Sequence, residues 1–354
     1  MSTQNTRFRA MSWMRVLAFA FIIVYHFIFE LEQKGNFDPE NGPLIQYSNS
    51  NLHIAIIGVS LFFMLSGAGL MLSSMRKWDL KDFYRRRFTK LLIPFYVVEI
   101  FTLIASLALK REWLSYFPFI SKAKIIFNFL GMDGYFEQFF PTFSLHVGEW
   151  FLGALIMLYV LFPVFRFCME KNRYVTILVA TVYYVVLNYG NFFSISPWTN
   201  VFVKAYDFIL GMFLITEIPG LMEKKSFRRA LWLVSFLIIL IGMGLKPVIP
   251  MPTAIVNLIY AVAIFIYFFS SDNIKLKDTV LDELIEKICA LSYEVFLVHH
   301  IIIYYIGDNI EGQIMGHKQI LALFVTEIII MLAMAMLVRN IVNFINQKFL
   351  KRIQ

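Results

Sequence analysis

Long apolar runs separated by short polar stretches follow one another along the whole sequence. Each run is about 20 residues long, the length that an α-helix needs to cross a hydrocarbon core about 30 Å thick. We therefore predict ten transmembrane helices. The predicted spans cover approximately residues 11–30, 54–75, 88–109, 147–168, 174–192, 201–218, 229–247, 253–271, 287–306 and 320–345.

A further apolar stretch, residues 117–131, is too short for a span, and we interpret it as an interfacial or re-entrant helix. If it crossed the membrane, the orientation of everything after it would invert. The composition, 59% hydrophobic and 16% charged, agrees with a polytopic membrane protein. The expected fold is an all-α membrane protein with a single domain, residues 1–354, and a short cytoplasmic tail at residues 346–354.

The basic residues predict the orientation of the spans. With the N-terminus inside, 24 of the 32 Lys and Arg fall on the cytoplasmic side. The positive-inside rule then favours ten spans with both termini in the cytoplasm. The net charge of +8 thus reflects topology, and nucleic acid is not an expected partner. The two cysteines, Cys168 and Cys289, are too few for a disulfide framework.

The first span, WMRVLAFAFIIVYHFIFE, carries two ionisable residues, Arg15 and His26. Eleven residues make three helical turns plus about 20°, so both side chains share one stripe about 16 Å apart along the axis. An ionisable group inside a membrane costs at least about 2.5 kcal/mol, which suggests a polar pathway. In the simpler alternative, Arg15 reaches the headgroups and His26 bonds a neighbouring helix. Glu30, one turn further on, is a candidate to orient the imidazole.

Two further stretches carry candidate chemistry. Before the third span, Arg87 and Lys90 share a helical face, with Arg86 beside them, and such a basic group suits phosphates or lipid headgroups. Near the end, LSYEVFLVHH places Ser292, Phe296 and either His299 or His300 on one helical face. Ser292 and His299 are supporting candidates.

Two other stretches are interpreted mainly as structural. The small residues of FFMLSGAG, residues 62–69, favour close helix packing. Glu149 stands beside Trp150 at the start of a span, where tryptophan is a normal interfacial anchor. We keep Glu149 as a supporting candidate for the histidines.

Together these stretches resemble the acyltransferase-3 family, bacterial membrane proteins that O-acylate cell-surface glycans. The resemblance rests on the ten-residue gap between Arg15 and His26, on FFMLSG, on Arg87 and Lys90 before LLIP, on WFL at 150–152, and on SYEVFLVH at 292–299. It covers most of the chain, from Arg15 to about residue 307. Two features depart from the family pattern. Lys90 lacks the bidentate fork of arginine, and Ala154 stands where many members have a glutamate.

The resemblance implies a function and its partners. It implies an O-acyltransferase, most simply an acetyltransferase, that moves an acyl group from cytoplasmic acyl-CoA to a hydroxyl of a surface or lipid-linked glycan. His26 and Arg15 would be catalytic, and Arg86, Arg87 and Lys90 would bind the donor. No tightly bound cofactor is implied. The expected setting is the bacterial cytoplasmic membrane, among membrane lipids and envelope-biosynthesis proteins, without the esterase-like domain that larger members append.

The sequence also allows other functional hypotheses. Ten helices with intramembrane charge also suit an exporter of polysaccharide or small molecules, or a non-catalytic subunit of an envelope-synthesis complex. A metal site at His26, His299 and His300 is disfavoured, because adjacent side chains on one helix diverge by about 100°. No metal is therefore predicted.

Overall fold

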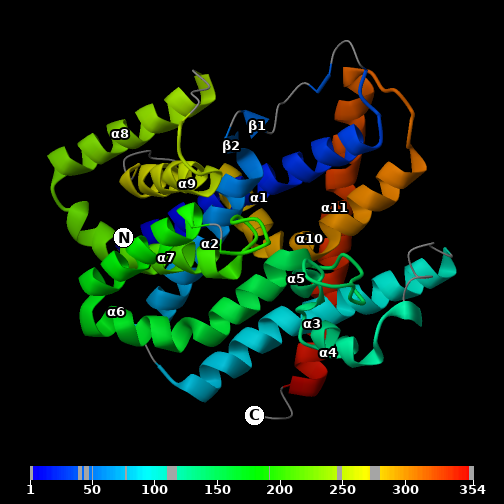
Figure 1. Cartoon of the computed structure of the whole chain (residues 1–354), viewed down its shortest axis with the longest axis horizontal. Coiled ribbons are helices and arrows are strands. Elements are labelled where there is room, and N and C mark those ends of the chain that lie inside the picture. The colour runs from blue at the N-terminus through cyan, green and yellow to red at the C-terminus, as the bar shows by residue number, and fades with distance from the viewer. Residues whose placement is uncertain are drawn as a thin grey trace. The chain divides into compact units, whose positions relative to one another are not determined.

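In a computed structural model the chain is almost entirely helical (Figure 1). The structure describes residues 3–38, 42–43, 48–49, 51–75, 78–109, 118–190, 192–244, 249–271 and 280–350. The long helices are α1 (Thr3–Gln33), α2 (Ile54–Ser74), α3 (Leu80–Ala108), α6 (Glu149–Tyr189), α7 (Val201–Leu221), α8 (Lys225–Gly244), α9 (Thr253–Ser270), α10 (Val280–Asn309) and α11 (His317–Ile345).

Short elements connect some of these helices. Strands β1 (Ser48–Asn49) and β2 (Leu52–His53) form a small antiparallel hairpin. Between α3 and α6 lie η2 (Lys122–Lys124), α4 (Ile125–Phe129) and α5 (Asp133–Phe136). Because η2 and α4 have three and five residues, residues 118–131 are too short a helical stretch to span a bilayer. The predicted tail begins with a π-helical turn, η3 (Asn346–Leu350), and its residues 351–354 lie outside the described part.

In the described part of the chain, eight helices are long and apolar enough to cross a membrane. The all-α membrane fold is therefore confirmed, while the number of ten spans and the cytoplasmic termini stay predictions. The ten predicted spans fall on nine helices because α6 covers two of them. Asn172 interrupts α6 with a non-helical backbone, and its Oδ1 accepts a hydrogen bond from the Val175 N–H at 3.1 Å. That contact caps the second half of α6.

The chain forms two compact units. Unit 1 contains Met1–Tyr25, Gln46–Trp78 and Leu161–Ala290, and unit 2 contains His26–Ile45, Asp79–Val160 and Leu291–Gln354. Helices α1, α6 and α10 each contribute to both. A single domain over residues 1–354 was expected from the sequence, and it stays a prediction.

Glycines bring α2 and α7 of unit 1 into close contact. A Cβ atom on Gly67 would lie 2.1 Å from the backbone oxygen of Phe208, and one on Gly211 would lie 2.0 Å from that of Met64. Neither position can carry a larger side chain without separating the helices. The predicted packing role of the FFMLSGAG stretch is confirmed at Gly67. In the same unit α8 lies along α9 (Figure 1).

Unit 2 is built around α3, α10 and α11. Helix α11 contacts α3, and the Tyr293 hydroxyl on α10 donates a hydrogen bond to the Leu91 carbonyl on α3 at 2.8 Å. After α1, Asn36 donates from Nδ2 to the carbonyls of Ile310 (2.6 Å) and Gln313 (3.0 Å). These bonds fix the end of α1 against the end of α10.

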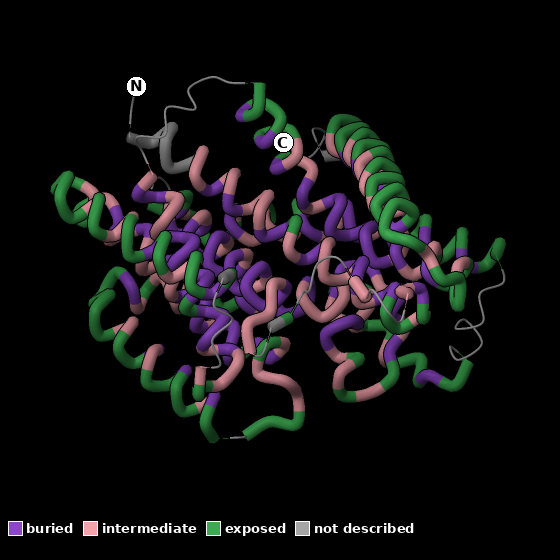
Figure 2. The backbone as a smooth tube through the Cα atoms, turned by 90° about the horizontal axis from the view of Figure 1, so that it is seen from above, coloured by how far each residue is buried: buried purple, intermediate pink, exposed green. Residues whose placement is uncertain are grey.

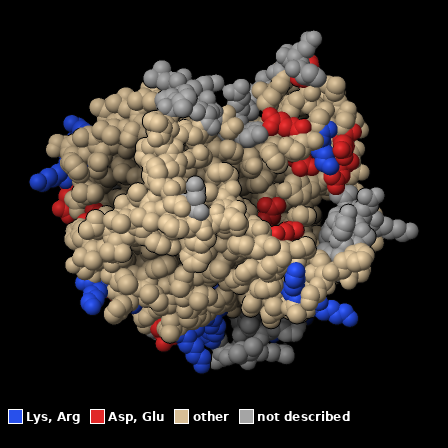
Figure 3. Space-filling model, viewed as in Figure 1, with Lys and Arg blue, Asp and Glu red and all other residues tan. Residues whose placement is uncertain are grey.

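The outer surface agrees with a membrane setting. Many helices are buried along one side and exposed along the other (Figure 2). Broad areas of the face in Figure 3 show no charged side chain. Exposed leucine, isoleucine, valine and phenylalanine are frequent on the long helices, as expected where lipid replaces water.

Candidate active site

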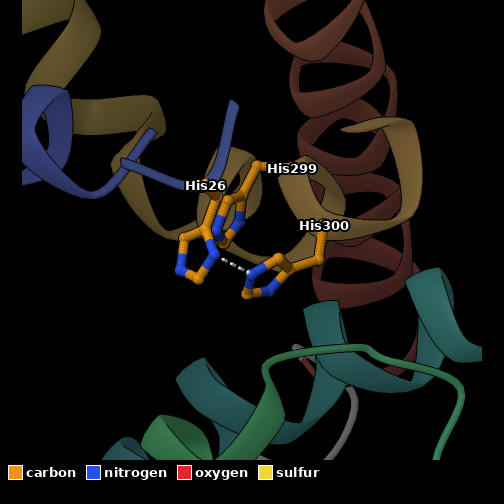
Figure 4. A group of neighbouring side chains, drawn as sticks. All are labelled: His26, His299 and His300. Atoms are coloured by element: carbon orange, nitrogen blue, oxygen red, sulfur yellow. Dashed lines mark hydrogen bonds between the residues drawn. The ribbon is translucent and has the colours of Figure 1, made fainter. Parts of the chain in front are cut away.

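Three histidines meet in unit 2. His26 lies on α1, while His299 and His300 lie on α10, and their rings turn toward one another (Figure 4). Nε2 of His300 is 2.8 Å from Nδ1 of His26. The His299 ring centroid lies 5.4 Å from that of His26 and 4.2 Å from that of His300. His299 and His300 are buried, whereas His26 is half-buried.

A carboxylate continues the chain of contacts. Nδ1 of His300 lies 2.9 Å from Oε1 of Glu149, at the start of α6. The hydroxyl of Tyr304 donates to the same oxygen over a longer distance of 3.4 Å. The Tyr304 ring lies 5.2 Å from the His300 ring and 5.4 Å from the His146 ring. Glu149 keeps 21% of its side chain exposed, so the chain of contacts begins at a reachable carboxylate.

The turn before α6 has an uncommon backbone conformation, which fixes the position of Glu149. His146, Gly148 and Glu149 have φ of 59°, 73° and 40°, in the left-handed region that favours glycine. A Cβ atom on Gly134 would lie 2.5 to 2.7 Å from the Glu149 backbone. The close packing of α5 therefore supports the strained turn that presents Glu149 to His300.

These contacts determine where protons reside. An ionised carboxylate only accepts hydrogen bonds, and a neutral imidazole has one N–H and one lone pair. With Glu149 ionised and both rings neutral, His300 donates from Nδ1 to Glu149 and accepts at Nε2. His26 then donates from Nδ1 and carries its lone pair on Nε2. The arrangement makes Nε2 of His26 chemically suited to act as a base or a nucleophile.

His299 has a different partner. Its Nδ1 lies 2.6 Å from the Phe296 carbonyl, one turn earlier on α10. Aromatic rings extend from there: Phe296 lies 5.1 Å from Phe151 and 6.3 Å from Tyr293, measured between centroids. An aromatic column therefore leads from the histidines toward the α3 side of α10.

The basic residues stand at the other end of this column, on α3. Arg87 is half-buried and lies near Tyr159, which in turn lies near Tyr293. Arg86 and Lys90 are exposed. Of the three predicted donor-binding residues, Arg87 is thus the one in contact with the interior of unit 2.

Acidic groups surround the loop between α4 and α6. Burial, together with a smaller effect of the Glu137 charge, raises the pKa of Asp133 to about 7, against an opposing hydrogen bond from its own backbone. Burial also raises the pKa of Glu137, while His146 and Ser144 lower it. Asn128 donates to Oε1 of Glu99 at 2.6 Å. Asp133 in this loop and Glu99 on α3 are therefore buried carboxyl groups, whereas Glu137 is exposed.

The remaining predicted site residues are Arg15, Glu30 and Ser292. Arg15 belongs to unit 1, where its Nη1 lies 3.6 Å from Sγ of Cys289. Glu30 is buried against Gly307, whose Cβ position would lie 2.8 Å from its Oε1. Ser292 is buried on α10. The carboxylate that the structure brings to the histidines is thus Glu149. The sequence favoured a structural interpretation of the Glu149 stretch over a role in supporting the histidines.

Sequence reasoning missed the linking residues. His300, Tyr304 and His146 were not among the predicted site residues, although His300 connects His26 to Glu149. The sequence spacing gave one indication of these residues, because His300 and Tyr304 are four positions apart and share a helical face. The positive φ of His146 left no trace in the sequence beyond the neighbouring glycine at 148.

Of the comparisons with known proteins, one gave a match. No curated protein and no solved structure matched the chain. The sequence profile of the acyltransferase-3 family, described as an acyltransferase domain, matches residues 8–339. That range contains every residue of the site and nearly the whole chain, so this protein belongs to the acyltransferase-3 family and is a multi-pass membrane acyltransferase.

Proposed function

We propose that this protein is an O-acyltransferase that moves an acyl group, most simply acetyl, from acyl-CoA to a hydroxyl of a surface or lipid-linked glycan. The observation that carries the proposal is the chain from His26 through His300 to Glu149. With Glu149 ionised and both rings neutral, it places the lone pair of His26 on Nε2, within a membrane acyltransferase domain.

In the proposed reaction, Nε2 of His26 removes the proton of the acceptor hydroxyl as the oxygen attacks the thioester carbonyl. The new C–O bond forms, the C–S bond breaks, and the CoA thiolate takes the proton back from His26. His300 and Glu149 stabilise the imidazolium through their hydrogen bonds. In the variant route His26 attacks the thioester itself and passes the acyl group to the hydroxyl.

The donor would bind at the α3 end of the aromatic column. Arg87 would hold CoA phosphates with Arg86 and Lys90, because guanidinium and ammonium groups form strong charge-assisted hydrogen bonds to phosphate. The slender pantetheine arm would follow the column from Tyr293 to His299.

The cellular location and the partner proteins are part of the same proposal. We place the protein in the bacterial cytoplasmic membrane, with the donor inside and the glycan acceptor reached through the membrane domain. Envelope-biosynthesis proteins are the proposed partners. No tightly bound cofactor is part of the reaction.

Two measurements test the proposal together. Surface glycan from cells with and without the protein would be compared by mass, and the loss of an acetyl mass per repeat is expected. Purified protein in liposomes would then be given labelled acetyl-CoA, succinyl-CoA or a long-chain acyl-CoA with the isolated glycan. Unchanged glycan mass together with no transfer from any of the donors would contradict the proposal.

A further inference from the structure

The three histidines have the hydrogen-bond pattern of metal ligands. Metal-binding histidines usually donate one ring N–H to a carbonyl or carboxylate and bind the metal with the other nitrogen. Nδ1 of His299 faces the Phe296 carbonyl, and Nδ1 of His300 faces Glu149. In both rings the lone pair therefore lies on Nε2, and Nε2 of His300 faces His26.

His299 supplies an independent sign of a missing ligand. It is fully buried, at 0% exposure, and its Nε2 has no hydrogen-bond partner among the described residues. A buried lone pair without a hydrogen-bond partner is energetically unfavourable. Acyl transfer by His26, His300 and Glu149 makes no use of this atom.

The distances suit a single ion after small side-chain rotations. One ligand nitrogen from each of His26, His299 and His300 lies within 4.8 Å of the others. Zinc–nitrogen bonds of about 2.0–2.1 Å in a tetrahedron place the nitrogens roughly 3.3 Å apart. The divergence of adjacent residues on α10 does not prevent this, because the rings of His299 and His300 lie 4.2 Å apart and approach the same His26 (Figure 4).

We propose that His26, His299 and His300 form a binding site for a divalent transition-metal ion such as Zn²⁺, and that the bound ion switches off acyl transfer. Three imidazoles suit zinc, cobalt, nickel or copper, whereas magnesium and calcium require oxygen ligands. A neutral imidazole has one lone pair. If His26 binds the metal through Nδ1, the nitrogen that faces His300, its proton lies on Nε2. Nε2 then has no lone pair for a hydroxyl proton or a thioester. This inhibitory consequence rests on the proposed function, while the binding itself does not.

Cobalt binding to the purified full-length protein tests the site. The protein would carry an affinity tag without histidine and would be titrated with Co²⁺, whose visible absorption reports tetrahedral coordination. We expect uptake of about one ion per chain, displaced by Zn²⁺. His299→Ala and His299→Gln should remove the absorption, and Glu149→Gln should weaken binding by about 10- to 100-fold. His317→Ala, at an exposed histidine outside the cluster, is the matched control and should bind like wild type.

The outcomes separate the two proposals. Folded wild type that binds no more Co²⁺ than folded His299→Gln overturns the metal site. If wild type transfers acyl groups, Zn²⁺ should inhibit it, a chelator should restore it, and any remaining activity of His299→Gln should be insensitive to zinc. Zinc-insensitive transfer by metal-loaded wild type overturns the inhibitory role. Cobalt binding without transfer from any donor would count against the acyltransferase proposal alone.

Discussion

Both units bury ionisable groups, and they neutralise them differently. In unit 1, Lys204 and Asp207 are each 0% exposed and pair at 2.9 Å, while Lys204 also donates to Ser60 at 3.0 Å. In unit 2, the contacts run from His26 through His300 to Glu149, whose side chain is 21% exposed. The first arrangement is closed to solvent, and the second ends at a carboxylate that is partly exposed.

This difference separates a structural role from a chemical one. In the buried pair, Oδ2 of Asp207 contacts Lys204, while Oδ1 has no hydrogen-bond partner among the described residues. Both side chains are fully buried, so a substrate does not reach them, and breaking the pair is costly. A chain of neutral imidazoles fixed at one end by a carboxylate holds each ring in one tautomer, so the lone pair of the last ring lies on Nε2. We therefore assign the Lys204–Asp207 pair to folding and the histidine chain to transfer.

The largest expected effect on stability is that of breaking the closed pair. Lys204→Met leaves Asp207 buried without its cation and should destabilise the protein by about 3–5 kcal/mol. Adding Asp207→Leu should recover most of that loss, because a buried pair is often replaceable by apolar side chains. Thermal unfolding in detergent measures both.

Arg173→Ala is the matched control for this pair. It breaks the more exposed ion pair with Glu217 in the same unit and should cost less than about 1 kcal/mol. Equal losses for Lys204→Met and Arg173→Ala would remove the distinction between closed and exposed pairs.

Asp133 in unit 2 shows a third way to neutralise a buried ionisable group, because its carboxyl is neutralised by a proton rather than by a charged partner. Its pKa rises from 3.8 to about 7 on folding through burial. Between these values the folded state holds a proton that the unfolded state has lost, so this contribution to stability is full below about pH 4 and is lost as the pH rises to about 7. The slope is at most about 1.4 kcal/mol per pH unit.

Asp133→Asn should remove this part of the pH dependence, since asparagine stays neutral in both states. Unfolding would be followed at about pH 5 and about pH 8 for both proteins. Parallel pH profiles for wild type and Asp133→Asn would show that the carboxyl is ionised in the folded state.

Glu149→Gln tests the anchored end of the histidine chain. Hydrogen bonds to charged groups contribute about 1.5–3 kcal/mol, so its loss should lower the transfer rate by about 10- to 100-fold. Its effect should fall on kcat more than on KM, because Glu149 stabilises the charge that develops on the imidazoles. A change confined to KM for the donor would instead place Glu149 in substrate binding.

The smallest effects are expected at the basic residues of α3. Arg87→Ala should raise KM for acyl-CoA by about tenfold, consistent with one lost charge-assisted hydrogen bond. Lys90→Ala, at an exposed site, should raise it by about threefold. Arg85→Ala, whose side chain pairs with Asp82, is the control and should leave KM unchanged. The order would be contradicted by a larger effect at Lys90 than at Arg87.

Much of the fold followed from the sequence, because lipid permits few solutions for apolar runs of about 20 residues. The interruption at Asn172 was also visible, since the polar stretch around it separates two predicted spans. The contact between His300 and Glu149 was not visible in the sequence, because it joins residues 151 positions apart through a strained turn. Helical spacing gives neighbours on one helix, and it gives no information about which distant helix supplies the partner.

The same limit applies to the predicted partner of His26. Glu30 lies one turn from His26 on α1, and spacing alone favoured it over Glu149. The structure places Glu30 against Gly307 instead. A long-range contact therefore decided the position of the carboxylate, and local periodicity did not.

The most direct test measures acyl transfer per folded molecule for His26→Gln, beside the double variant Lys204→Met and Asp207→Leu. Thermal midpoints would be taken from the same preparations. His26→Gln should lose transfer by at least about 10²-fold while keeping a midpoint close to that of wild type. The double variant should keep its transfer rate. Near-normal transfer by folded His26→Gln would contradict the central claim that the His26 lone pair carries the reaction.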